Sequence, residues 1–115
     1  MRRMLYLPLA TVLLSGLPAP AVAAAGNFTI VNGTEAGLSS LSIRRFGTSE
    51  WRPLAAAASP GARAAVQFSD TDCAFDLQAN LAGIGTATWA GVNLCEANVL
   101  TLRRGASGET WVDYD

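Results

Sequence analysis

Two cysteines, Cys73 and Cys95, limit the possible folds of this chain more than any other feature. They lie 22 positions apart, and the midpoint between them falls in Gly83-Ile84-Gly85, so a hairpin that turns there places them opposite each other. Because the chain has no His and no C-x-x-C spacing, neither a structural zinc site nor a catalytic dithiol is expected. We predict an intramolecular Cys73–Cys95 disulfide, with free thiols or intermolecular pairing as the alternatives.

The first residues of the chain have the three-part order of a secretory signal peptide. Arg2 and Arg3 precede an apolar run over residues 5–17, and small residues follow it. This run is shorter than the roughly 20 residues that cross a bilayer. We therefore predict export, by the general secretory route in preference to the twin-arginine route.

Small side chains define two possible cleavage sites for this signal peptide. Ala21-Val22-Ala23 is the better match to the A-x-A pattern, and Ala23-Ala24-Ala25 is the second. We predict a signal peptide over residues 1–23, followed by a single domain over residues 24–115. No Cys lies near the site to carry a lipid, so no membrane anchor is expected after cleavage.

The rest of the chain consists of short segments with alternating polar and apolar residues, separated by Gly, Pro or Asn-Gly turns. The expected strands cover residues 28–32, 38–46, 64–69, 73–78, 86–95, 99–104 and 110–114. Residues 53–58 predict a turn of helix instead, because Pro suits the first helical position and Ala the interior. The pattern as a whole predicts an all-β fold, a small antiparallel β-sandwich of about six to seven short strands.

The alternation changes phase within residues 86–95. Val92 and Leu94 are out of step with Trp89 and Cys95. A β-bulge near Gly91 would shift the facing of the strand by one residue. It would not bring Leu94 and Cys95 onto one face, so the direction of Cys95 stays open.

The composition excludes several classes of function. The chain has no His, and all of its 8 basic residues are Arg, which removes Ser/His/Asp triads, imidazole metal sites and Schiff-base chemistry. Its net charge of −1 gives no reason to expect a nucleic-acid partner. We assign no catalytic, cofactor-binding or metal-binding residue and expect a non-enzymatic protein with an unknown protein or envelope partner. The alternatives are a small secreted hydrolase that uses carboxylates, and an inhibitor that presents residues 47–62 to a larger enzyme.

Three acidic residues, Asp70, Asp72 and Asp76, lie close together in the sequence. Clustered carboxylates attract hard cations such as calcium, but this spacing does not match the twelve-residue calcium loop. Asp76 is also expected on the outward face of a strand that turns Phe75 and Leu77 inward. We therefore favour a solvated turn over a cation site, and the sequence does not decide between them.

Other polar and aromatic residues have both structural and functional interpretations. Trp51, Trp89 and Trp111 could form a platform for sugars, although Trp in a small β domain is more often part of the core. Asn27 and Asn32 match the N-glycosylation acceptor pattern. The pairs at residues 44–45 and 103–104 are both Arg-Arg, and neighbours on a strand point to opposite faces. We expect these arginines in salt bridges or in solvent, with an anion site as the alternative.

Four short pieces of the chain carry a resemblance: residues 28–32 (FTIVN), Trp51 ahead of Pro60-Gly61, residues 73–77 (CAFDL) and residues 92–95 (VNLC). With them the chain resembles small exported bacterial single-domain proteins of unassigned function. The resemblance implies a periplasmic or secreted β-sandwich with its two cysteines paired. It implies no catalytic residues.

Overall fold

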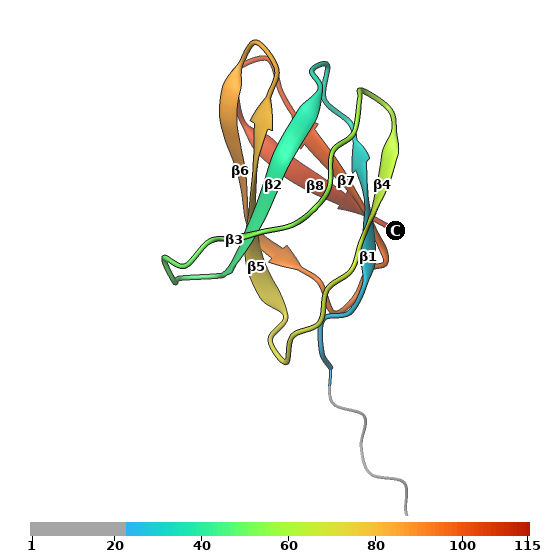
Figure 1. Cartoon of the computed structure of the whole chain (residues 1–115), viewed down its shortest axis with the longest axis vertical. Helices are drawn as coiled ribbons and strands as arrows, with labels where there is room; N and C mark the ends of the chain where they lie inside the picture. Colours follow the sequence, from blue (N-terminus) through green and yellow to red (C-terminus); the bar gives the residue numbers. More distant parts are fainter. Residues whose placement is uncertain (1–22) are drawn as a thin grey trace, which may run out of the picture.

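The computed structural model describes residues 23–115, so the predicted signal peptide lies outside the described residues except for Ala23. The described chain is all-strand (Figure 1). Its eight strands are β1 (Phe28–Asn32), β2 (Leu38–Arg45), β3 (Arg52–Pro53), β4 (Arg63–Val66), β5 (Ala74–Leu81), β6 (Gly85–Asn93), β7 (Val99–Arg104) and β8 (Thr110–Tyr114). They form two four-stranded sheets, in the orders β4-β1-β7-β8 and β3-β2-β5-β6. The predicted all-β class is confirmed, with one strand more than expected.

The extra strand corrects the helical turn predicted over residues 53–58. Arg52 and Pro53 pair with β2 as strand β3, and the N–H of Leu54 donates to Leu41 of β2 at 2.7 Å. Further on, Ala58 and Leu38 exchange both backbone hydrogen bonds at 2.9 Å. The helix propensity of the alanines is overridden because an extended chain here satisfies the outer backbone edge of β2.

A core of apolar side chains lies between the two sheets. The largest apolar side chains that are almost fully buried are Trp89, Phe75, Ile30, Leu41, Ile43, Leu77, Leu81, Leu100, Leu102 and Val92. Trp89 also joins the sheets by a hydrogen bond, since its Nε1 on β6 donates to the carbonyl of Arg103 on β7 at 2.9 Å. Leu41 and Ile43 share one face of β2, and Phe75 and Leu77 share one face of β5. The alternating pattern predicts correctly that both faces point into the core.

One strand pair departs from the predicted antiparallel arrangement. β1 pairs with β7 in parallel, with Ile30 facing Leu100, whereas every other strand pair is antiparallel. Between β1 and β7 the chain passes twice through the second sheet, as β2–β3 and as β5–β6, so no short hairpin forces the two strands to run in opposite directions. The structure is thus a mostly antiparallel pair of sheets.

The predicted disulfide is confirmed, and the predicted register around it is wrong. Cys73 and Cys95 are bonded, with their Cα atoms 5.1 Å apart. The hairpin turns at residues 82–84, with Leu81 facing Gly85, one residue earlier than the symmetric arrangement requires. Cys73 accepts a hydrogen bond from the N–H of Leu94 at 2.9 Å, so Cys95 follows the residue that faces Cys73.

A β-bulge in β6 resolves the change of phase in the sequence. Leu77 faces Trp89 but Phe75 faces Val92, so Asp76 of β5 lies opposite two residues of β6. One of them, Gly91, has a φ of +65°, a conformation that glycine adopts at little cost. The bulge lies at the glycine that the sequence offers for one, and it turns Val92 and then Leu94 toward the same core as Trp89.

Asn32 is a buried structural residue. Its Nδ2 donates to the carbonyls of Ala36 at 2.8 Å and Ala58 at 2.9 Å, and its Oδ1 accepts from the N–H and the hydroxyl of Thr34. The Asn32-Gly33-Thr34 match to a glycosylation acceptor therefore belongs to a buried turn, where an amide with four hydrogen bonds leaves no room for a glycan.

Candidate functional site

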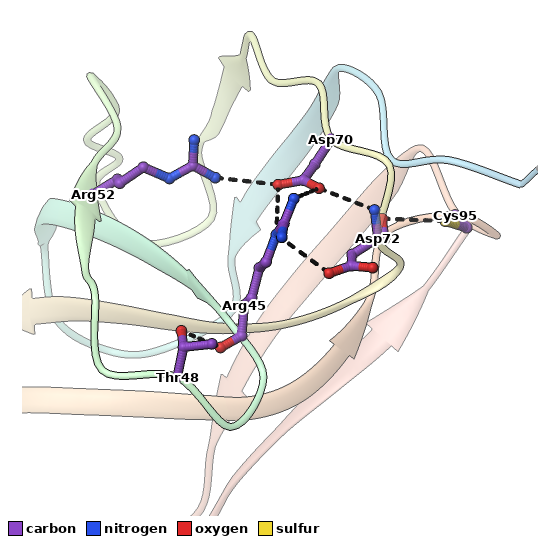
Figure 2. Close-up of polar contacts among 6 residues, drawn as sticks. All are labelled: Arg45, Thr48, Arg52, Asp70, Asp72 and Cys95. Atoms are coloured by element: carbon purple, nitrogen blue, oxygen red, sulfur yellow. Dashed lines mark hydrogen bonds and ion pairs between the residues drawn. The ribbon is translucent and has the colours of Figure 1, made fainter.

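The candidate site is a pocket of about 330 Å³ next to the loop between β2 and β3. It is lined by Arg45, Thr48, Glu50, Arg52 and Asp70. Figure 2 shows that the guanidinium groups of Arg45 and Arg52 approach the Asp70 carboxylate from different strands, β2 and β3. The pocket therefore combines two cations, a shared carboxylate, a hydroxyl and a further acid.

Asp70 is the centre of this ion-pair network. Arg45 contacts it twice, from Nη2 to Oδ1 at 2.8 Å and from Nε to Oδ2 at 3.3 Å. Arg52 adds a longer contact from Nη2 to Oδ2 at 3.4 Å. Arg45 Nε also lies 3.2 Å from Oδ2 of Asp72, so a single guanidinium joins two carboxylates (Figure 2).

The backbone holds both sides of the network in place. Asp70 exchanges two backbone hydrogen bonds with Ala25, at 2.9 and 3.1 Å, and its Oδ1 accepts from the N–H of Asp72 at 2.9 Å. On the other side, Thr48 donates from its N–H and its hydroxyl to the carbonyl of Arg45, which closes the turn after β2. Cys73 follows Asp72 directly, so the disulfide ties the end of this loop to the chain after β6.

The electrostatics of the site favour the charged forms of its groups. The hydrogen bond from Arg45 lowers the pKa of Asp70, the N–H of Asp72 lowers it further, and partial desolvation opposes both effects. The hydrogen bond and the charge of Asp70 in turn raise the pKa of Arg45. The Asp70 side chain is only 6% exposed because the arginines and the neighbouring backbone cover it, and its lowered pKa keeps it charged at neutral pH.

The three acids singled out in the sequence do not meet at one point. Asp70 and Asp72 share Arg45, whereas Asp76 lies on β5, with its Oδ2 2.8 Å from Nε of Arg44. Among residues 23–115 no group of three or more metal-ligating side chains is placed to hold an ion. The expected solvated turn is also wrong for Asp70 and Asp76, because arginines cover both carboxylates.

The three tryptophans do not form a platform. Trp89 is in the core, Trp111 is exposed on β8, and Trp51 lies next to β3 with the guanidinium carbon of Arg44 4.4 Å from its ring centroid. The neighbouring arginines of β2 separate as expected, since Arg44 binds Asp76 and Arg45 binds Asp70.

The loop expected over residues 47–62 is only partly a projecting loop. Figure 1 shows the chain between β2 and β3 extending away from the sandwich, while the chain from Arg52 onward returns along β2. Phe46, at the start of this loop, is the most exposed large apolar residue of the described chain, with 61% of its surface accessible. Phe46 is not indicated as a surface residue by the sequence, because the alternation over residues 38–46 assigns it to the end of a strand.

Comparison with known proteins adds no further assignment. No protein-family model, curated protein or solved structure matches the chain. The described residues include no helix long and apolar enough to span a membrane.

The network at Asp70 predicts a specific loss of stability in acid. Because the pKa of Asp70 is lowered by folding, its stabilising contribution is complete above the unfolded pKa of about 4 and is lost as the pH falls through the folded pKa. We expect Asp70→Asn to lower the Tm at pH 7, and the difference from the wild type to shrink below about pH 4. Thermal unfolding between pH 7 and about pH 2.5 measures this difference.

The matched control is Asp113→Asn. Asp113 pairs with Arg103 at the surface with 56% of its side chain exposed, so its replacement should change the Tm little at any pH. A difference between Asp70→Asn and the wild type that stays constant over the whole pH range would contradict the assignment.

Proposed function

We propose that this chain is an exported, non-enzymatic binding protein whose contact surface is the β2–β3 loop with the adjoining pocket. Two features support export. The N-terminal segment has the order of a signal peptide, and the Cys73–Cys95 disulfide is the kind of bond that forms and persists in oxidising compartments such as the periplasm or the extracellular space. The partner is then a protein or another envelope component of that compartment.

The environment of the Asp70 carboxylate supports a binding function in preference to a catalytic one. A general acid that works near neutral pH needs a raised pKa, usually produced by apolar burial or a second anion. Asp70 has the opposite environment, because Arg45 and Arg52 both contact it. Such a carboxylate orients two guanidinium groups and does not transfer protons.

The exposed groups of the site are those that contribute most to protein–protein binding. Arg45 and Arg52 each leave about half of the side chain exposed, and Phe46, which follows Arg45 in the chain, is 61% exposed. The Phe46 ring lies toward Gly91 of β6, next to the pocket residues in sequence but not part of the pocket lining. Aromatic residues and Arg are enriched among the residues that dominate binding free energies. The ion pairs with Asp70 hold both guanidinium groups in position before a partner arrives, which reduces the entropy lost on binding.

The structure also favours one of the two possible cleavage sites. Ala25 is 5% exposed, and its two backbone hydrogen bonds to Asp70 hold the loop of the candidate site. Cleavage after Ala25 would remove this contact, whereas cleavage after Ala23 keeps it.

We therefore expect the exported protein to begin at Ala24. Intact-mass and N-terminal peptide measurements on protein recovered from the periplasm or medium test this directly. A mature chain that begins at Gly26 would contradict the role given to Ala25, and a chain that keeps Met1 would contradict export by cleavage.

The binding surface is tested by Phe46→Ala, with Ile84→Ala as the matched control. Both positions are exposed apolar residues in hairpin loops, with 61% and 42% of their surface accessible. We expect Phe46→Ala to weaken capture of the partner from a periplasmic extract by about tenfold or more, and Ile84→Ala to leave it unchanged. Equal capture by the wild type and Phe46→Ala would contradict this surface.

A further inference from the structure

The outer edge of β4 differs from the other sheet edges of the described chain. The edges of β6 and β8 are joined by side chains, since Thr110 Oγ1 donates to the carbonyl of Thr88 at 2.6 Å and the Asn93 N–H donates to the Tyr114 hydroxyl at 3.1 Å. The outer edge of β2 is covered by β3 and the chain that follows it. β4 ends its sheet, and none of the residues 23–115 pairs with its outer side.

The register of β4 on β1 shows which backbone groups point outward. Hydrogen-bonded and non-hydrogen-bonded pairs alternate along an antiparallel ladder. The N–H of Asn32 donates to Ala62, so the next hydrogen-bonded pair of this ladder is Ile30 with Ala64. Thr29 is the next residue of β1 beyond Ile30, so it belongs to a non-hydrogen-bonded pair of this ladder, and its N–H accordingly donates away from β4, to Asn98.

The residues of β4 that face Thr29 and Val31 therefore direct their backbone groups to the open side. These residues are Ala65 and Arg63, and Gln67 continues the same alternation just beyond the strand. Each offers one N–H and one carbonyl. Together they form a ready-made edge for another strand.

We infer that the β4 edge pairs with β4 of a second copy of this chain, antiparallel about a two-fold axis at Ala65. The outward residues are spaced evenly around Ala65, so in this register each of them faces another outward residue of the second copy. Ala65 faces Ala65 of the second copy, and Arg63 faces Gln67 of the second copy. Each facing pair exchanges two N–H···O=C bonds, and the two sheets become one continuous sheet.

The side chains suit this register. The only charged residue of the edge, Arg63, lies opposite a neutral amide, so no like charges face each other. The exposed Ala65 at the axis is small enough for two strands to approach closely. Pro, Lys and bulges are common means of blocking an edge, and β3 contains Pro53. Residues 63–67 have no Pro or Lys, and the register of β4 on β1 is regular along the strand. The two-against-one pairing of Gly61 and Ala62 with Asn32 lies before the strand.

This inference depends only on the strand register of β4. The dimer can therefore be absent while the β2–β3 loop still binds a partner, and the loop can fail to bind while the dimer still forms. The test is sedimentation equilibrium of the purified exported protein over a range of concentrations up to about 1 mM. We expect a reversible monomer–dimer equilibrium. Ala65→Pro should leave a folded monomer, because the N–H that it removes is not bonded to β1.

Two opposite replacements at Gln67 test the register itself. Gln67→Glu puts a carboxylate opposite Arg63 of the second copy and should tighten the dimer, whereas Gln67→Arg puts like charges there and should weaken it. We expect their dissociation constants to differ by about tenfold, since each change acts twice across the axis. Thr86→Glu and Thr86→Arg, at an exposed position of β6, provide matched controls that should leave the dimer unchanged.

Three results would overturn the inference. If the wild type is a monomer at every concentration, the β4 edge does not pair with a second copy, and only an extended segment of a different protein could bind it. A dimer that survives Ala65→Pro would place the interface elsewhere. Equal effects of the two Gln67 variants would exclude the antiparallel register about Ala65.

Discussion

The contact between Asp76 and the bulge of β6 determines much of the arrangement of this protein. The Asp76 carboxylate accepts from the N–H of Gly91 through Oδ1 at 2.9 Å and from Arg44 through Oδ2 at 2.8 Å. Both oxygens of a buried acid are thus satisfied, one by the bulge and one by a cation. The bulge changes which face of β6 the following residues present, so Val92 and Leu94 enter the core behind Trp89.

The candidate site follows from the same shift. With the bulge in place Leu94 faces Cys73, and Cys95 lies just beyond it, close enough for the disulfide. The disulfide fixes the end of the loop that contains Asp70 and Asp72, and these carboxylates orient Arg45. The opposite oxygen of Asp76 holds Arg44, whose guanidinium lies on Trp51 near the loop that presents Phe46. One buried carboxylate therefore connects the core packing to the exposed surface.

Local pattern predicts most of the strands, because short alternating segments between Gly, Pro and Asn-Gly turns have few other ways to bury an apolar face. The cysteine spacing predicts the disulfide, and the change of phase in residues 86–95 points to Gly91 as a possible bulge without deciding it. Local pattern fails where a distant partner decides the outcome. Ala55 to Ala58 favour a helix locally but follow the edge of β2, and β1 runs parallel to a strand about seventy residues away.

In the candidate site, too, the sequence predicts local features but not contacts between distant residues. The sequence indicates that Arg44 and Arg45 point to opposite faces, but not that each of them meets an aspartate more than twenty residues further along the chain. Asp76 is misjudged for this reason, since an outward-facing acid is normally solvated and only tertiary contacts bury it. Asn32 resembles a surface acceptor site in sequence, and its buried hydrogen bonds become visible only when Ala58 is placed beside it.

The most direct test of this account is a double-mutant cycle between Asp76 and Gly91, measured as free energies of unfolding in urea. Asp76→Ala removes the acceptor. Gly91→Ala strains the bulge through the positive φ of residue 91 and not through a clash, because the nearest atom to an added Cβ is in the Phe46 ring at 3.9 Å. Each variant alone releases the bulge, so the double variant should lose less than the sum of the two by about 1 kcal/mol or more. Losses that add to within about 0.5 kcal/mol would show that Asp76 does not hold the bulge, and would contradict the account.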